Sequence, residues 1–328
     1  MRVMVTGGAG YIGSVMVRVL EEDSHDVLVL DDMSKGHIQA AGGARLVRVD
    51  LEDRSAVNEA CGTFRPEACM HFAAQSLVGE SMEKPLKYFM ANLSGSLNLL
   101  SGLVKAGCGK LVFSSSAAVF GAPECVPIAE DAATSPISPY GISKLAFEQV
   151  LAHVARAGDV SYASLRYFNA AGADLEHGLG EDHRPETHLI PKVIAAALGK
   201  ERSVAIFGDD YPTPDGTCIR DYIHVRDLCQ AHLLALGHLS SGGESGVFNL
   251  GNGSGFSVRE VLESVRRVSG EDFSVVVEDR RPGDPPALVA SSAKIRSVLG
   301  WKPSFTDIDG IVGTAWRWHS EHPDGYSS

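Results

Sequence analysis

Short apolar runs alternate with helical patterns along most of the chain. A β-rich run at 2–6 precedes apolar positions that recur at a helical period over 15–20. Further strand-like runs lie at 27–30, 46–49, 69–72, 110–114, 162–166 and 247–250. Because helical patterns separate the earlier runs, the sequence predicts an α/β fold, a Rossmann-type doubly wound parallel sheet with helices on both faces.

Two long helices are predicted within this region. One spans 86–106 and contains Asn92, and the other spans 140–156. Ser138 can cap the second helix, while Pro139 occupies its first turn.

The pattern changes from Gly172 onward, where the segments 181–185 and 209–216 are polar and rich in Pro or Asp. A helix at 258–268 and a strand at 273–277 are predicted beyond them. We expect two domains with a discontinuous boundary, because the strand at 247–250 should return to the first sheet. The first comprises 1–171 with about 222–251, and the second, a smaller α/β substrate-binding domain, comprises about 172–221 with 252–328.

A glycine-rich loop, Gly7 to Gly13 (GGAGYIG), lies at the first strand-to-helix turn. Gly7 can make the tight turn, Gly10 lets the backbone approach a pyrophosphate, and Gly13 lets the helix pack closely on the strand. Asp31 ends the second strand, 18 residues after Gly13. Its carboxylate would bind a ribose 2′-hydroxyl and repel a 2′-phosphate, so the sequence predicts NAD rather than NADP.

Three residues further along can handle a proton. Tyr140 and Lys144 are four positions apart and therefore share one face of a helix, and Ser116 comes at the end of the strand before it. We expect Lys144 to lower the pKa of Tyr140, and Ser116 to hydrogen-bond the reacting oxygen. A Tyr-x-x-x-Lys pair alone is usually an amphipathic, solvated pair. Here the pair follows a glycine-rich turn and Ser116 in the chain, and this order favours proton transfer at a carbinol beside a nicotinamide ring.

Composition narrows the class of protein. The formal net charge of −12 over 328 residues opposes binding to nucleic acid or to an anionic membrane. Six cysteines without a CxxC pair indicate thiols in a reducing compartment, and the chain begins with a strand rather than a leader, so the cytoplasm is expected. The 12 histidines show no HExxH spacing, and His319 and His322 are expected at the surface, so no metal site is predicted.

The chain resembles the extended short-chain dehydrogenase/reductase family, in the branch that acts on nucleotide sugars. The matching motifs extend over nearly the whole length and lie at 7–13, 71–74, 78–81, 113–116, 138–144, 166–169, 205–208, 221–225 and 322–326. The resemblance implies an isomerase that interconverts UDP-galactose and UDP-glucose through a transient 4-keto sugar and NADH. It also implies a homodimer, formed through the helices that carry Asn92 and Tyr140.

The resemblance also implies roles for single residues. Tyr140, with Ser116 and Lys144, forms the catalytic group and takes the proton from the sugar 4-hydroxyl. The implied NAD contacts are Gly7, Gly10, Tyr11, Ile12, Gly13, Asp31, Ser34, Asp50, Leu51, Phe72, Ala73, Asn92, Ser114, Tyr140, Lys144 and Phe168. The implied UDP-sugar contacts are Ser116, Asn169, Leu189, Phe207, Arg220, Arg281, Asp284 and Leu288.

Three residues depart from the family pattern. Ser76 stands where a close variant has Lys, and His188 replaces an Asn that is often found in the substrate loop. Leu288 occupies a position that varies between Tyr and smaller residues beside the sugar 2-substituent. The hypothesis that follows is that a Leu leaves room for an N-acetyl group, so that UDP-N-acetylhexosamines are further substrates.

Two alternatives stay open. A nucleotide-sugar 4,6-dehydratase or a decarboxylase would share the fold, NAD and the Tyr/Lys pair, but it needs an acidic group after Ser116, where this chain has Ala117 and Ala118. An inactive NAD-binding regulator would have no need to keep Ser116, Tyr140 and Lys144 together.

Overall fold

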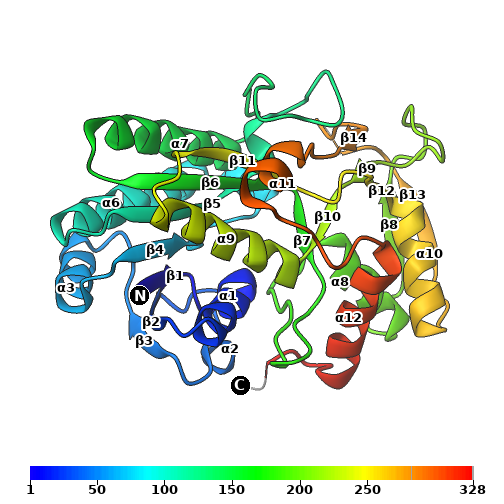
Figure 1. Cartoon of the computed structure of the whole chain (residues 1–328). Coiled ribbons are helices and arrows are strands. Elements are labelled where there is room, and N and C mark those ends of the chain that lie inside the picture. Colours follow the sequence, from blue (N-terminus) through cyan, green and yellow to red (C-terminus); the bar gives the residue numbers. More distant parts are fainter. Residues whose placement is uncertain (282, 327–328) are drawn as a thin grey trace.

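The main sheet of the computed structural model contains seven parallel strands (Figure 1). The structure describes residues 1–281 and 283–326. In spatial order the strands are β11 (Gly246–Leu250), β6 (Ser161–Tyr167), β5 (Lys110–Ser116), β4 (Ala68–His71), β1 (Arg2–Thr6), β2 (Asp26–Asp31) and β3 (Arg45–Arg48). The predicted fold class, a doubly wound parallel sheet, is confirmed.

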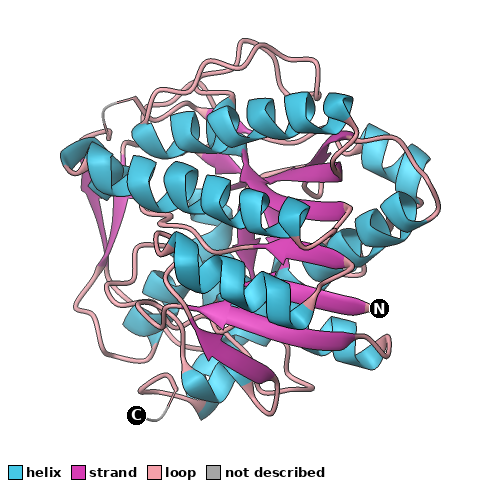
Figure 2. Ribbon diagram, turned by 90° about the vertical axis from the view of Figure 1, so that its left-hand side faces the viewer, coloured by secondary structure: helices cyan, strands magenta, loops and turns pink. Residues whose placement is uncertain are grey.

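Helices cover both faces of this sheet (Figure 2). One face packs on α1 (Tyr11–Glu22) and α9 (Val225–Ser240), and the other packs on α3 (Arg54–Phe64), α6 (Gly95–Lys105) and α7 (Pro139–Ala157). Alternation along β1 shows why, since Val3 and Val5 enter the first core while Met4 enters the second. A sheet buried on both sides explains why its strands appear in the sequence as continuous apolar runs.

A third hydrophobic core lies among α8 (Leu189–Ala197), α10 (Val258–Ser269) and α12 (Ile308–Glu321). Short strand pairings accompany it: β7 (Asn169–Ala171) with β10 (Tyr222–His224), β8 (Val204–Phe207) with β13 (Val275–Glu278), and β9 (Ile219–Arg220) with β12 (Phe256–Ser257) and β14 (Ala287–Leu288). The remaining elements are α2 (Ile38–Ala41), α4 (Val78–Glu83), α5 (Pro85–Tyr88), η1 (Phe89–Ser94), the 3₁₀ helix η2 (Ala117–Val119) and α11 (Ala293–Leu299). This separate core is consistent with the expected second domain, whose boundaries stay a prediction.

The predicted helices agree with the structure unequally. α7 begins with Pro139, and its N-cap Ser138 accepts a hydrogen bond from the amide of Gly141 at 3.2 Å. The helix predicted at 86–106 is wrong as a single α-helix, because η1 is a π-helical segment between α5 and α6. Asn92 lies inside η1, where its buried amide bonds to the backbone of Gln75. The predicted strand at 273–277 begins two residues later, at Val275.

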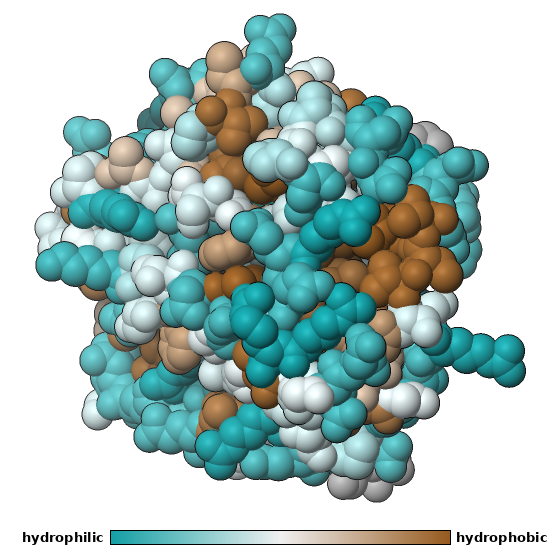
Figure 3. Space-filling model, turned by 90° about the vertical axis from the view of Figure 1, so that its right-hand side faces the viewer, coloured by the Kyte–Doolittle hydropathy of each residue, from teal (hydrophilic) through white to brown (hydrophobic). Residues whose placement is uncertain are grey.

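The surface mixes hydrophilic and hydrophobic residues on the side where Figure 1 places α10 and β13 (Figure 3). Among the described residues, no helix combines the length and the apolar character that crossing a membrane requires.

Candidate active site

The predicted cofactor residues gather at one edge of the main sheet. Parallel strands all end at the same edge, so Gly7, Asp31, Phe72, Ser116 and Phe168 lie at or just beyond the carboxyl ends of β1, β2, β4, β5 and β6. This edge is where ligands bind in open α/β sheets. The topology therefore places the glycine loop and the catalytic candidates on one side of the molecule.

The glycine loop has the geometry of a tight strand-to-helix turn. Gly7 has a φ of +71°, a conformation that favours glycine, and a Cβ there would lie 2.6 Å from the amide nitrogen of Ala73. A Cβ on Gly13 would lie only 2.0 Å from the carbonyl oxygen of Gly7. A Cβ on Gly10, in contrast, would meet only that oxygen, at an ordinary 3.4 Å. The protein itself therefore requires glycine at 7 and 13, whereas the openness at Gly10 fits a ligand.

The N-terminus of α1 is free of side-chain capping. Gly10 is the N-cap residue, and no side chain accepts a hydrogen bond from the first turn. Unpaired backbone N–H groups at a helix N-terminus bind phosphate. The Tyr11 hydroxyl points elsewhere and donates to the carbonyl oxygen of Gly172 at 2.6 Å, while Ile12 packs against the core. The first turn thus fits the pyrophosphate of a dinucleotide.

Asp31 connects β2 to the glycine loop. Its buried carboxylate accepts hydrogen bonds from the backbone amides of Ala9 at 3.0 Å and Met33 at 2.9 Å. Burial raises the pKa of Asp31, and these two amide bonds counteract part of the rise. The carboxylate is therefore held beside the phosphate loop, as a ribose-binding acid requires.

Ser116 and Tyr140 meet at the end of β5. The Ser116 hydroxyl accepts a hydrogen bond from the amide of Ala118 at 3.1 Å, and it is near enough to the Tyr140 phenol to affect the pKa of that group. Burial raises the pKa of Tyr140, and the neighbouring Ser116 hydroxyl lowers it. Burial therefore dominates the pKa of Tyr140 in the protein chain by itself, and a lowering of this pKa by Lys144 stays a prediction.

Lys144 lies one turn further along α7 and is almost fully buried. Its Nζ donates to the carbonyl oxygen of Ser114 at 2.9 Å and lies 5.8 Å from the centre of the Tyr140 ring. Burial lowers the pKa of Lys144 to about 7, against the opposing charge of Glu148. An ammonium with this pKa changes its protonation state near neutral pH, and it is placed beside the phenol.

Further polar residues support this group, and of these the sequence singled out only Ser114. Arg166 pairs with the buried Glu148 at 2.6 Å, and Glu148 also accepts a hydrogen bond from Ser115 at 2.5 Å. The hydroxyls of Ser114 and Tyr167 lie 2.5 Å apart. In the sequence, the only sign that Glu148 lies near this group was its spacing from Lys144, which is one helical turn.

His71 is a further buried residue near this group. Its two ring nitrogens lie 2.7 Å from the hydroxyls of Thr6 and Ser96, and its ring stacks on Phe113. Burial and the charge of Lys144 lower its pKa to about 3, so it is neutral at physiological pH. His71 therefore links β1, β4 and η1–α6 as a structural residue.

The other predicted cofactor contacts differ in exposure. Ser34 and Asp50 are exposed, whereas Leu51 is buried beneath the sheet edge. The amide of the buried Asn92 also reaches Ser143 of α7, at 3.2 Å. Phe72, Ala73 and Phe168 are half-buried, and each packs against a hydrophobic core. Their contacts with NAD stay predictions.

Most of the predicted substrate residues lie in the smaller unit, whereas Ser116 ends β5 and Asn169 begins β7. Arg220 of β9 forms an ion pair with Asp284, and the guanidinium of Arg281 lies 3.9 Å from the centre of the Phe207 ring. The Asn169 side chain donates to the carbonyl oxygen of Asp221 at 2.9 Å. Leu189 begins α8, and Leu288 lies in β14. Asp284 thus already neutralises one of the two arginines expected to bind a diphosphate.

Two histidine expectations need revision. His322 stacks on Trp318 with ring centres 4.9 Å apart, and His319 contacts the same indole edge-on, so both are packing residues rather than free surface groups. The structure also brings together Glu181, His183, Glu186 and His188, whose common location the sequence did not predict.

Comparison with known proteins defines the class. The model of the NAD dependent epimerase/dehydratase family matches residues 3–251. The chain belongs to this family, and the cofactor of the family, NAD, is the predicted one.

Individual relatives are similar over the full length. The UDP-glucose 4-epimerase of Halalkalibacterium halodurans is 48% identical over 328 residues, which cover 100% of this chain and 98% of the relative. The crystal structure of UDP-glucose 4-epimerase from Brucella ovis in complex with NAD is 44% identical, covers 96% of this chain and 97% of that one, and has a TM-score of 0.94. The UDP-Glc/GlcNAc 4-epimerase of Campylobacter jejuni is 41% identical over 98% and 99% of the two chains, with a TM-score of 0.86.

Proposed function

We propose that this protein interconverts UDP-galactose and UDP-glucose by inverting C4 of the hexose. The observation that carries the proposal is the buried arrangement of Ser116, Tyr140 and Lys144 at the carboxyl edge of the sheet. Full-length relatives named UDP-glucose 4-epimerase support the same reaction.

NAD fits the edge of the sheet described above. The free first turn of α1 suits its pyrophosphate, and Asp31 suits a ribose hydroxyl. When bound, NAD takes up a hydride from the sugar and returns it, and its positive charge favours the deprotonated form of a neighbouring phenol.

The chain's own residues would then handle the proton. Tyr140 removes the proton of the sugar 4-hydroxyl and later gives it back, while Ser116 hydrogen-bonds the same oxygen. Lys144, with a pKa near 7, stabilises a Tyr140 phenolate when it is charged. Because burial raises the pKa of Tyr140, the protein alone keeps the phenol protonated until ligand charge is added.

Recognition of the substrate is expected from the smaller unit. Arg220 and Arg281 would bind the diphosphate through charge-assisted hydrogen bonds, and Asn169, Leu189 and Phe207 would line the UDP site. Strong binding of the diphosphate would retain the nucleotide while the hexose turns to present its other face.

The direct test is a product assay. Purified protein is incubated with UDP-galactose, without added nicotinamide cofactor, and UDP-glucose is measured by chromatography. The proposal predicts formation of UDP-glucose up to equilibrium. A dehydratase would release a 4-keto-6-deoxy sugar nucleotide and a decarboxylase would release CO₂ from a UDP-uronate. The methyl groups of Ala117 and Ala118 in η2 cannot supply the acid or base that those reactions need.

We also infer that UDP-N-acetylhexosamines are substrates. Leu288 is half-buried in β14 and packs against the small cluster around Val119, Phe120 and Ile128. The Campylobacter jejuni relative is named for both UDP-Glc and GlcNAc. The same product assay with UDP-N-acetylglucosamine tests this point, and a Leu288→Tyr variant should lose this activity selectively. Negligible turnover by the unmodified protein would reject the inference.

We further infer that two copies associate through α4, α5, η1 and α7. Large apolar side chains are exposed there at Val78, Met82, Leu86, Met90 and Ile142, with Leu86 77% exposed. An apolar surface of this kind marks a protein–protein contact. Light scattering should give the mass of a dimer, and Leu86→Asp should shift the mass toward the monomer; a monomer for the unmodified protein would refute it.

Cytoplasmic residence stays a prediction, supported by six free cysteines, five of them buried.

A further inference from the structure

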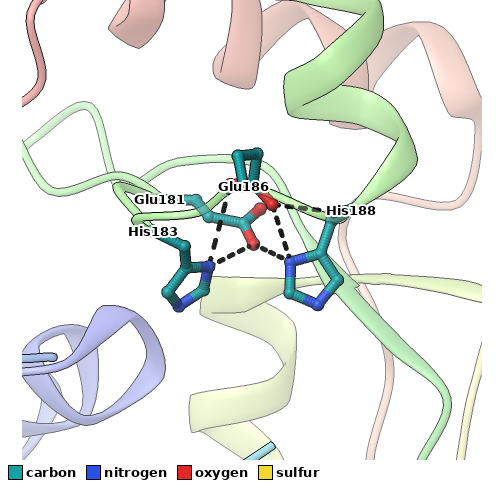
Figure 4. A group of neighbouring side chains, drawn as sticks. All are labelled: Glu181, His183, Glu186 and His188. Carbon is teal, nitrogen blue, oxygen red and sulfur yellow. Dashed lines mark hydrogen bonds and ion pairs between the residues drawn. The ribbon is translucent and has the colours of Figure 1, made fainter. Parts of the chain in front are cut away.

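Four side chains of types that can bind metals converge in the loop between β7 and α8 (Figure 4). The carboxylate of Glu181 lies 3.0 Å from Nδ1 of His183 and 2.6 Å from Nδ1 of His188. The carboxylate of Glu186 lies 3.2 Å from Nδ1 of His188 and 3.8 Å from Nδ1 of His183. One donor atom from each of the four residues lies within 4.8 Å of all the others.

These distances suit a small cation at the centre of the group. Ligands placed about 2.1 Å from a tetrahedral Zn²⁺ are about 3.4 Å from one another. The four nitrogen–oxygen separations, from 2.6 to 3.8 Å, bracket that value. Small side-chain movements in the loop would equalise them. Two imidazoles and two carboxylates are also a ligand set that Zn²⁺ accepts.

The negative charge of Glu181 and Glu186 also favours a bound cation. Two carboxylates need two positive charges, and Glu181 is only 5% exposed, so water screens it poorly. With a divalent cation both imidazoles are neutral ligands, and the four side chains and the ion together carry no net charge.

We propose that Glu181, His183, Glu186 and His188 bind a divalent metal ion of the zinc class. This proposal reverses the prediction from histidine spacing, and it does not rest on the proposed epimerase activity. All four positions of a tetrahedral ion would be filled by protein, so the site is structural rather than catalytic.

The surroundings of the loop indicate what the ion would stabilise. Lys35 donates to the carbonyl oxygen of Arg184 at 2.9 Å, and Nε2 of His37 lies 2.9 Å from the carbonyl oxygen of Asp182. The ring of His183 meets the ring of Tyr11 edge-on, with centres 6.3 Å apart. His188 directly precedes α8. The ion would therefore fasten the start of α8 to the glycine turn and to the loop after β2.

The experiment measures metal on the full-length protein. Protein produced with added Zn²⁺ is dialysed against metal-free buffer, and its zinc is counted by inductively coupled plasma mass spectrometry. Zinc should remain at one ion per chain. In His183→Ala the affinity for Zn²⁺, measured against a competing chelator, should fall roughly a hundredfold or more, since even outer-shell changes cost 10–100-fold.

His177→Ala is the matched control, because His177 belongs to a second group of donors with Glu22 and Glu176. It should retain zinc. Cobalt substitution needs no variant, and the unmodified protein with Co²⁺ should show the intense visible absorption of a tetrahedral ion. The proposal is overturned if the unmodified protein keeps no zinc, if its cobalt spectrum is that of an octahedral ion, or if zinc is lost in His177→Ala and kept in His183→Ala.

Discussion

The Nζ of Lys144 donates a hydrogen bond to the carbonyl oxygen of Ser114, 2.9 Å away. This bond joins α7 to the end of β5 and fixes the ammonium beside the Tyr140 ring. The buried position lowers the pKa of Lys144 to about 7. Its protonation therefore connects catalysis with stability.

Stability should depend on pH through Lys144. Between pH 7 and 10 the unfolded chain keeps the lysine proton while the folded chain has lost it, so the unfolded state binds more protons and stability rises with pH. The slope is at most about 1.4 kcal/mol per pH unit. Lys144→Met removes it. Denaturant unfolding of cofactor-free protein should show that the free energy of unfolding rises more steeply between pH 7 and 10 for the unmodified chain than for Lys144→Met. Parallel curves would contradict the lowered pKa of Lys144.

The Glu148–Arg166 pair should be important for folding. Both side chains are buried, so Arg166→Met leaves an uncompensated carboxylate and should lower the free energy of unfolding by about 3–5 kcal/mol. Arg45→Met is the control, because Arg45 and Asp26 form an exposed ion pair. That change should cost less than about 1 kcal/mol. Equal losses in the two variants would show that burial does not set the cost.

Ser116→Ala should move the pH profile of catalysis. The Ser116 hydroxyl lowers the pKa of Tyr140, so its removal raises that pKa, and activity should begin to fall at a higher pH as the solution is acidified. We also expect kcat/KM to fall roughly 10²-fold. Ser116→Thr keeps a hydroxyl and should retain the original profile. An unchanged profile in the alanine variant would exclude this role of Ser116.

The glycine loop allows a paired test of packing against cofactor binding. Gly13→Ala places a Cβ 2.0 Å from the carbonyl oxygen of Gly7 and should cost about 1–3 kcal/mol of stability. Gly10→Ala makes only an ordinary protein contact, so the melting temperature should hold while NAD affinity falls roughly tenfold or more. Calorimetric unfolding and NAD titration separate the two effects. A Gly10→Ala variant that binds NAD normally would place the pyrophosphate elsewhere.

Local patterns made the fold predictable. Apolar runs and the glycine turn are determined by neighbouring residues, so β1 and β2 lie close to where the sequence placed them, while α1 begins at Tyr11, four residues before the predicted apolar period. The N-cap and the first-turn proline of α7 were predictable for the same reason, because both are determined by adjacent residues. The π-helical break at η1 was not predictable, because Asn92 there bonds to Gln75 and Ser143, which are distant in sequence.

The site was predictable in composition but not in its electrostatics. The order of Ser116, Tyr140 and Lys144 indicated the chemistry, yet the pKa of Tyr140 depends on burial that no spacing reveals. The convergence of His183 and His188 on Glu181 likewise depends on how one loop folds. Such contacts are properties of the tertiary structure.

The central claim, that Tyr140 is the proton-transferring residue, is tested most directly by Tyr140→Phe. The variant should fold and bind NAD as the unmodified protein does, while the rate of UDP-galactose conversion to UDP-glucose falls between about 10²- and 10⁴-fold. Circular dichroism and NAD content provide the controls. Conversion by the folded, NAD-containing variant at the unmodified rate would contradict the account.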